Sequence, residues 1–139
     1  DRIPGRIRRL VYVDAFLPES GESFLDLALP AMADMVRSST REGMIGPPWS
    51  RQGQPPPTDT AQPLKTFTEK LQLTDEPALK RIPATYILTV APGKTEDDFD
   101  RFAERARRRG WPVLRLTADH VPERSAPREL VDLLLRPTP

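Results

Sequence analysis

The amino-acid sequence predicts an α/β fold in which a parallel sheet of three strands is flanked by helices. Three apolar runs rich in β-branched residues supply the strands, at residues 9–13, 85–90 and 111–117. A helical pattern follows the second and the third run, and this alternation of strand and helix is typical of parallel sheets with helices packed against them. Three parallel strands make a narrow sheet with open edges, so we expect it to be one part of a larger sheet.

The composition narrows the classes of function. The 139 residues include 21 basic and 20 acidic side chains, for a formal net charge of +1, so we expect neither nucleic acid nor an anionic membrane as a partner. The chain has no cysteine and one histidine, which excludes disulfides, thiol catalysis and a histidine-rich metal site within it. No apolar run is long enough to cross a bilayer and no signal peptide is visible, so we expect a cytoplasmic location.

Prolines divide the chain into three predicted segments. There are 17 of them, far above the usual share, and with several glycines they concentrate in residues 38–63, which predicts an irregular loop there. The segments are a core strand with its following loop at 1–19, a proline-rich insertion at 20–80 and a second core segment at 81–139. Because the first residue is Asp rather than Met, we expect that a preceding segment was removed by processing or by design.

Helices are predicted in the insertion from caps and apolar spacing. Ser23 is placed to cap a helix over residues 24–29. Pro30 interrupts this helix, and a second short helix is predicted over residues 31–37. Apolar spacing predicts one amphipathic helix over residues 64–73.

Two further helices are predicted in the second core segment. Thr95 is expected to cap a helix over residues 96–109, because an acidic residue follows it at the spacing of a capping box. Gly110 is expected to end this helix. Ser125, which precedes an Ala-Pro pair, is expected to cap the last helix, over residues 125–135.

Two polar side chains at strand ends are candidates for chemistry. Asp14 ends the first predicted strand, and His120 lies on a proline-containing loop after the third. The carboxyl ends of parallel strands meet at one edge, where open α/β sheets place their sites, and imidazole is well suited to moving protons near neutral pH. From the residues alone, each also has an ordinary structural interpretation: an aspartate bonded to nearby backbone amides, and a surface histidine in a connection.

Three segments of the sequence resemble the C-terminal half of the α/β-hydrolase superfamily, and most closely its small esterase and hydroxynitrile-lyase-like branch. They are residues 7–18, 81–87 and 110–135, which look like the family's sixth, seventh and eighth strands. The resemblance spans nearly the whole chain, and it implies that residues 20–80 form the cap over the active site. It also implies a partner, the N-terminal half of the same hydrolase, which would complete the sheet as a second chain or as a segment outside these residues.

The resemblance implies that His120 is the general base of a Ser-His-acid triad. The acid of the family usually follows the seventh strand, where this chain has no carboxylate, but some members place it after the sixth strand, where Asp14 stands. We therefore expect Asp14 to be the acid, with Asp97 or Asp98 as the alternative. Asp119 adjoins the histidine, and because sequence neighbours rarely orient each other's side chains, it is interpreted as a loop residue.

The family's nucleophile motif, G-x-S-x-G, is absent from the sequence. The resemblance therefore implies that the serine and the oxyanion-hole amides belong to the N-terminal half, and that this chain alone is inactive. The expected function is cleavage of an ester or related acyl substrate without a cofactor or a metal. Alternatives are the same fold with other chemistry, as in a hydroxynitrile lyase, an epoxide hydrolase or a dehalogenase, or a non-catalytic hydrolase-like binding protein.

An apolar substrate pocket is a further expectation of the sequence. Its candidate residues are Met44, Trp49 and Phe16. Large apolar groups in the insertion are equally well explained by core packing, and Trp49 also fits an anchor that ties the proline-rich loop to the body of the protein.

Overall fold

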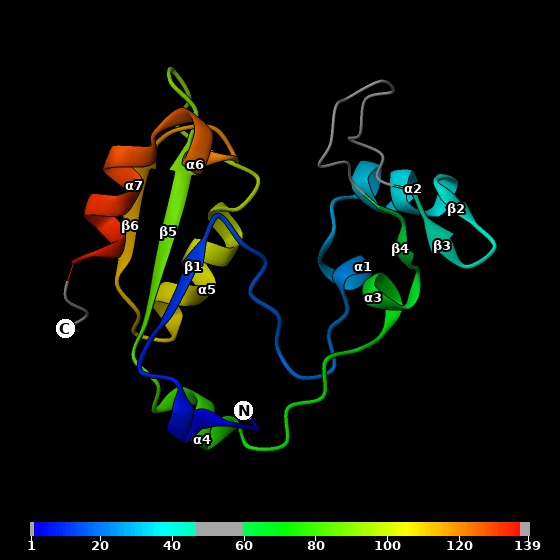
Figure 1. The fold of residues 1–139 in the computed structure, drawn as a ribbon, viewed down its shortest axis with the longest axis horizontal. Coiled ribbons are helices and arrows are strands. Elements are labelled where there is room, and N and C mark those ends of the chain that lie inside the picture. Colours follow the sequence, from blue (N-terminus) through cyan, green and yellow to red (C-terminus); the bar gives the residue numbers. More distant parts are fainter. Residues whose placement is uncertain (1, 47–59, 137–139) are drawn as a thin grey trace. The chain divides into compact units, whose positions relative to one another are not determined.

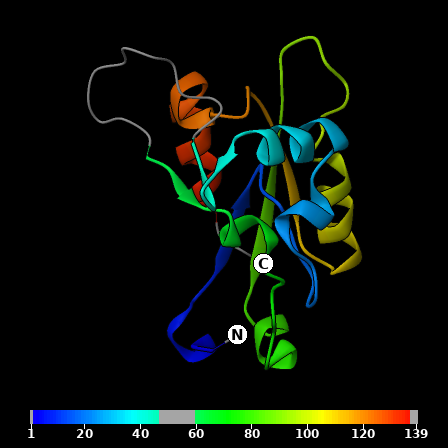
Figure 2. The same cartoon turned by 90° about the vertical axis from the view of Figure 1, so that its right-hand side faces the viewer.

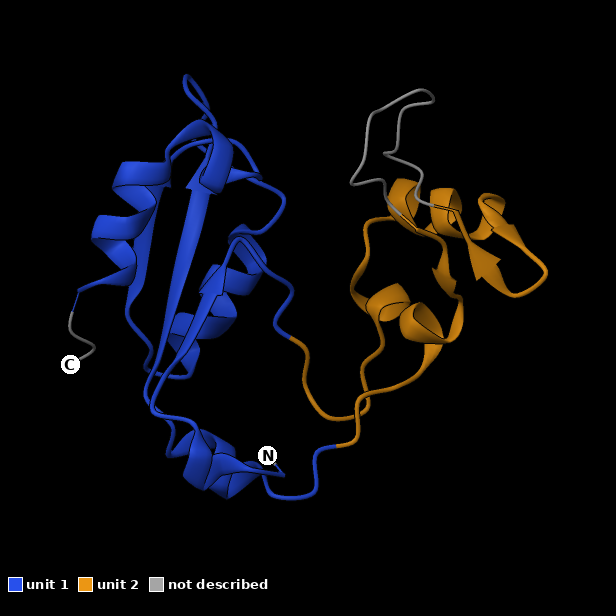
Figure 3. Cartoon of the chain, viewed as in Figure 1, with its two compact units in different colours: residues 1–17, 73–139 blue, residues 18–72 orange. Residues whose placement is uncertain are grey.

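The computed structural model describes residues 2–46 and 60–136. The chain forms two compact units, which Figure 3 colours separately. Residues 1–17 and 73–139 form the first unit, and residues 18–72 form the second. No helix within the described part of the chain is both long and apolar enough to span a bilayer.

The first unit is built on a parallel sheet of three strands. They are β1 (Leu10–Val13), β5 (Ala84–Val90) and β6 (Val113–Thr117), in the spatial order β1-β5-β6 (Figure 1). This confirms the predicted fold class. Every residue of β5 is buried, whereas the residues of β1 are only partly covered. In the register of the sheet, Val13 lies beside Ile87, so β1 ends before the central strand does and the next residue lies against β5.

Helices cover both faces of this sheet. The helices α5 (Asp100–Arg108) and α7 (Pro127–Leu134) lie on opposite sides of it (Figures 1 and 2). Leu130 of α7 packs in one apolar cluster with Ile87 and Leu116 of the sheet. Three residues of α5 are buried, namely Phe102, Ala103 and Ala106.

Both helices begin later than the sequence predicted. Residues 96–99 precede α5, because the N–H of Asp97 donates to the Asp100 carboxylate at 2.7 Å and so opens the helix further along the chain. Ser125 does not cap α7, because it ends a separate short helix, α6 (Pro122–Ser125). The predicted end of α5 is confirmed, since Gly110 follows it with a φ of +76°.

Two short helical segments precede strands of the sheet. The 3-10 helix η1 (Pro4–Arg6) leads toward β1, and α4 (Glu76–Lys80) leads into β5. Residues 18–19 fall in the second unit, although the sequence predicts them in the first core segment. Residues 73–80, which the sequence predicts as part of the insertion, fall in the first unit. The reason is local, since α4 is joined to the central strand by only three residues.

The second unit is made of short elements around a small core. They are α1 (Phe24–Leu27), α2 (Pro30–Ser38), β2 (Thr40–Arg41), β3 (Met44–Ile45), β4 (Gln62–Pro63) and α3 (Lys65–Thr68). The predicted cap of the first helix is confirmed, because Ser23 and Asp26 form a reciprocal capping box. Val36, Ile45 and Phe67 form the buried cluster of this unit.

Part of the predicted irregular loop at residues 38–63 is ordered as an antiparallel sheet of β2, β3 and β4. The hairpin between β2 and β3 turns through Glu42 and Gly43, whose φ angles are +50° and +74°. Two consecutive positive φ angles are typical of tight hairpin turns, which favour Asn or Asp before the glycine. Because Glu42 stands where such turns favour Asn or Asp, the sequence did not predict this turn.

The helix predicted over residues 64–73 is wrong in its second half. The helix α3 ends at Thr68, and Glu69 is already extended. Beyond it, Leu71 exchanges backbone hydrogen bonds with another segment: its N–H donates to Glu22 and its carbonyl accepts from Gly21. A tertiary contact therefore overrides the helical spacing of these residues.

Candidate active site

Asp14 follows β1 and is buried against the central strand. Only 2% of its surface is exposed, and its φ of +44° is in the left-handed region, which aspartate tolerates better than most residues. Its N–H donates to the Ile87 carbonyl at 2.8 Å. Its Oδ1 accepts the N–H of Thr89 at 3.0 Å. Two bonds to β5 therefore fix the carboxylate near the carboxyl end of the sheet.

Tyr86 holds the residue that follows the aspartate. Its hydroxyl donates to the Ala15 carbonyl at 2.6 Å and accepts the Ala15 N–H at 3.1 Å. The tyrosine lies on β5 and is fully buried. Burial is the main cause that raises the pKa of its phenol well above the usual range, so the hydroxyl stays protonated and remains a donor. Its two bonds support the strained turn at Asp14.

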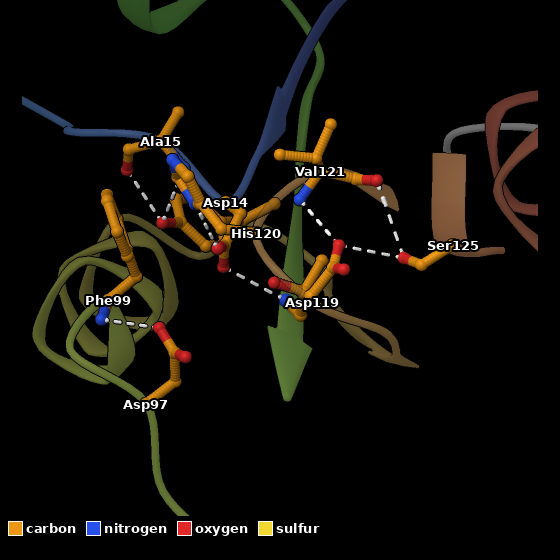
Figure 4. Close-up of polar contacts among 10 residues, drawn as sticks. Asp14, Ala15, Asp97, Phe99, Asp119, His120, Val121 and Ser125 are labelled. Carbon is orange, nitrogen blue, oxygen red and sulfur yellow. Dashed lines mark hydrogen bonds and ion pairs between the residues drawn. The ribbon is translucent and has the colours of Figure 1, made fainter. Parts of the chain in front are cut away.

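His120 lies on the loop between β6 and α6, and its imidazole contacts the buried aspartate. The Nδ1 atom is 2.7 Å from Oδ2 of Asp14 (Figure 4). The side chain of the histidine is 63% exposed, whereas that of the aspartate is 1% exposed. An ionised carboxylate can only accept a hydrogen bond, so the proton of the neutral imidazole is on Nδ1 and Nε2 is the atom that can take up another.

Asp119 shapes the histidine loop and does not orient the imidazole. Its Oδ1 accepts the N–H of Val121 at 2.9 Å and the hydroxyl of Ser125 at 2.8 Å (Figure 4). Both bonds lower the pKa of the Asp119 carboxyl, and the bond from the Val121 N–H has the larger effect. The interpretation of Asp119 as a loop residue is confirmed.

The two alternative acids do not occupy the position of Asp14. Asp97 accepts the N–H of Phe99 through Oδ1 at 3.0 Å, and Asp98 is exposed to solvent. The hydrogen bond at Nδ1 of His120 belongs to Asp14.

Comparison with known proteins gives one solved structure for this arrangement of elements. No protein-family model matches the chain, and no curated protein matches it. The solved structure is an extracellular α/β-hydrolase from a Paenibacillus species, described as sharing structural and functional homology with tobacco salicylic acid binding protein 2. It is 19% identical with a TM-score of 0.69, over 96% of this chain and 62% of that one. The chain has an α/β-hydrolase fold. It spans less than two thirds of the length of the Paenibacillus hydrolase.

The two described residues predicted for an apolar pocket belong to different units of the chain. Phe16 packs in an aromatic cluster with Phe99 and Phe102, at ring-centroid distances of 5.2 and 5.0 Å. Met44 belongs to β3 of the second unit and is 39% exposed. Trp49 lies outside the described residues.

Sequence reasoning missed one aromatic residue beside the histidine. The ring of Phe99 is stacked on the imidazole of His120, with centroids 5.0 Å apart and planes 18° apart. In the sequence, Phe99 is one apolar position within the helix predicted over residues 96–109. No pattern in the sequence distinguishes it from the other phenylalanine of that helix, because the stacking depends on how the two loops meet.

Proposed function

We propose that this chain supplies the histidine and the acid of the catalytic triad of a serine-dependent α/β-hydrolase, which cleaves an ester or a related acyl substrate. The observation that carries the proposal is the 2.7 Å contact between Nδ1 of His120 and Oδ2 of Asp14. A buried carboxylate that orients an exposed imidazole is the arrangement that general acid–base catalysis requires. A histidine in an ordinary surface connection has no need of such a carboxylate.

In the proposed reaction, Nε2 of His120 carries the proton. It takes the proton of the serine hydroxyl as the serine oxygen attacks the acyl carbon, and returns it to the leaving alkoxide, which departs as the alcohol. Water then attacks the acyl-enzyme and gives its proton to Nε2. The serine oxygen leaves, recovers that proton, and the carboxylic acid is released. Asp14 stays ionised and stabilises the imidazolium that forms in each half of the reaction.

We propose that the serine and the oxyanion-hole amides lie on an N-terminal portion of the hydrolase, carried by the same polypeptide or by a second one. The absence of a G-x-S-x-G motif from these 139 residues supports this. The partly covered edge strand β1 offers a place where that portion would continue the sheet. By the same proposal, residues 18–72 form the cap, and the chain alone is inactive. The expected cytoplasmic location stays a prediction.

The test is labelling with a fluorophosphonate serine probe, read as intact mass under denaturing conditions. We expect the polypeptide that carries the serine to gain the mass of the probe. His120→Ala and Asp14→Asn should each slow labelling by about a thousandfold or more. Asp98→Asn is the matched control, since it removes an exposed carboxylate of the same size and should leave labelling unchanged. The proposal fails if the polypeptide that carries the nucleophile takes up no label in the whole hydrolase, or if His120→Ala is labelled as fast as the wild type.

A further inference from the structure

The contact with Asp14 restrains the imidazole of His120 at one atom only. A single hydrogen bond at Nδ1 still allows small coupled changes in the two side-chain torsions of His120, which tilt the plane of the ring. Such a tilt would displace Nε2, the atom that exchanges protons. The side chain is 63% exposed, so general burial does not prevent the motion. A reactive imidazole on this loop needs a second restraint, because misplacement by about 1 Å is costly in catalysis.

Phe99 provides a contact of that kind. Its ring is nearly parallel to the imidazole, at 18° and a centroid distance of 5.0 Å, which lies within the range of attractive stacked geometry. Phe99 itself is only 8% exposed. The flat face of a buried ring therefore supports the flat face of an exposed one.

The position of Phe99 is itself fixed from several sides. Its N–H donates to Oδ1 of Asp97 at 3.0 Å (Figure 4), and its carbonyl accepts the N–H of Ala103 at 3.1 Å, in the first turn of α5. Its ring and that of Phe16 form a T-shaped pair, with an interplanar angle of 77° and centroids 5.2 Å apart. The stacking surface is thus attached to the body of the first unit.

We propose that Phe99 is a positioning residue for His120. Its ring holds the plane of the imidazole so that Nε2 points toward the nucleophile, and its π face attracts the imidazolium that forms during proton transfer. This inference rests on the proposed function. It also gives Asp97 a role different from the acid that the sequence left open: Asp97 acts through the backbone of Phe99.

The test combines nuclear magnetic resonance with kinetics on the whole hydrolase. In the wild type, the carbon-bound ring protons of His120 should resonate upfield, because they lie over an aromatic face; the signals are assigned by their loss in His120→Ala. Phe99→Leu should shift them downfield and lower kcat by about tenfold to a hundredfold, with KM little changed. Phe99→Tyr, which restores an aromatic face, should recover both.

Phe102→Leu is the matched control for loss of core packing. Phe102 lies three residues after Phe99, in α5, and is 2% exposed, but it is not stacked on the histidine. This variant should lose stability and keep the upfield ring protons. Should Phe99→Leu not fold, Asp97→Ala replaces it, since it removes only the bond to the Phe99 N–H at a partly exposed position; the same ring protons should then move partway downfield.

The outcomes separate this inference from the proposed function. The role of Phe99 is refuted if the chemical shifts of the His120 ring protons and kcat are unchanged in Phe99→Leu, or in Asp97→Ala where that variant replaces it. The triad stands in that case, provided that His120→Ala and Asp14→Asn abolish turnover. If Phe102→Leu reproduces every effect of Phe99→Leu, the residue is structural and the inference is also refuted. If turnover survives in His120→Ala, it is the proposed function that fails.

Discussion

At the scale of single residues, the candidate site depends on the buried carboxylate of Asp14, each oxygen of which has a hydrogen-bond partner. Asp14 accepts a backbone N–H from the central strand with one oxygen and meets the histidine with the other. Its left-handed backbone costs about 1 kcal/mol or more for a residue other than glycine. The neighbouring hydrogen bonds must hold that conformation, and the two bonds of Tyr86 to Ala15 are the most direct of them.

Replacement of Tyr86 by phenylalanine should therefore destabilise the protein. The change leaves the N–H and the carbonyl of Ala15 without their partner beside a fully buried ring, and we expect a loss of about 1–3 kcal/mol in the free energy of unfolding. Urea denaturation measures it. Tyr12→Phe is the control, because Tyr12 stacks on Tyr86 at 6.4 Å without bonding to this turn. Equal losses in the two variants would contradict the argument.

The same tyrosine predicts a dependence of stability on alkaline pH. Burial raises the pKa of the Tyr86 phenol above its ordinary value near 10. Above about pH 10 the unfolded chain loses the phenolic proton while the folded chain keeps it, so the free energy of unfolding must fall as the pH rises. Tyr86→Phe should make stability fall less steeply between about pH 10 and 11 than in the wild type. Parallel profiles would show that Tyr86 ionises as freely in the folded state as in the unfolded one.

At the scale of elements, the sequence predicts strands and helix ends that depend on nearby residues better than helix ends that depend on tertiary contacts. The buried strand β5 is a run of β-branched, aromatic and aliphatic residues, and Gly110 marks the end of α5. The end of α3 depends instead on a backbone contact of Leu71 with Glu22, which no spacing rule contains. The start of α5 has a local cause that the sequence prediction missed, because the N–H of Asp97 donates to the Asp100 carboxylate three residues on.

The candidate site shows the same division. Asp14 and His120 could be predicted to meet, because both follow parallel strands and such strands end at a common edge. The residues alone do not rank Asp14 above Asp97, since both follow strands; the family resemblance favours Asp14, and in the fold it is Asp14 that contacts Nδ1. It gave no indication of the stacking of Phe99.

The glycine that ends α5 allows a test of local backbone strain. Gly110 has a φ of +76°, and a Cβ added there would meet nothing within 4 Å, so Gly110→Ala tests the backbone conformation alone. We expect a loss of about 1–2 kcal/mol in the free energy of unfolding, measured by denaturant titration. Gly5→Ala is the matched control, because a Cβ at Gly5 also has open space and that residue has no positive φ. A neutral Gly110→Ala would show that the helix end relaxes to another conformation.

At the scale of the whole molecule, no strand of the described residues pairs with the side of β1 that faces away from β5. The N–H of Leu10 donates to Pro83 and that of Asp14 donates to Ile87. Because alternate residues of a strand bond to the same side, the amides of Val11 and Val13 point away from β5. A sheet that continues on another portion of the chain should have a fully buried central strand and an outer strand that is only partly covered. The strands β5 and β1 have these properties.

Amide hydrogen exchange tests that continuation without a mutation. In the whole hydrolase, the N–H groups of Val11 and Val13 should exchange slowly if the proposed N-terminal portion supplies a strand that accepts them. In the 139-residue chain the same two should exchange about as fast as solvated amides, provided that Leu10 and Asp14, whose acceptors are on β5, remain protected. Protection of the Leu10 and Asp14 amides shows that the sheet is still folded. Fast exchange at Val11 and Val13 then indicates an open edge and not an unfolded chain. Rapid exchange at Val11 and Val13 in the whole hydrolase would mean that β1 is a true edge, and the nucleophile would then have to reach His120 from a portion that does not extend this sheet.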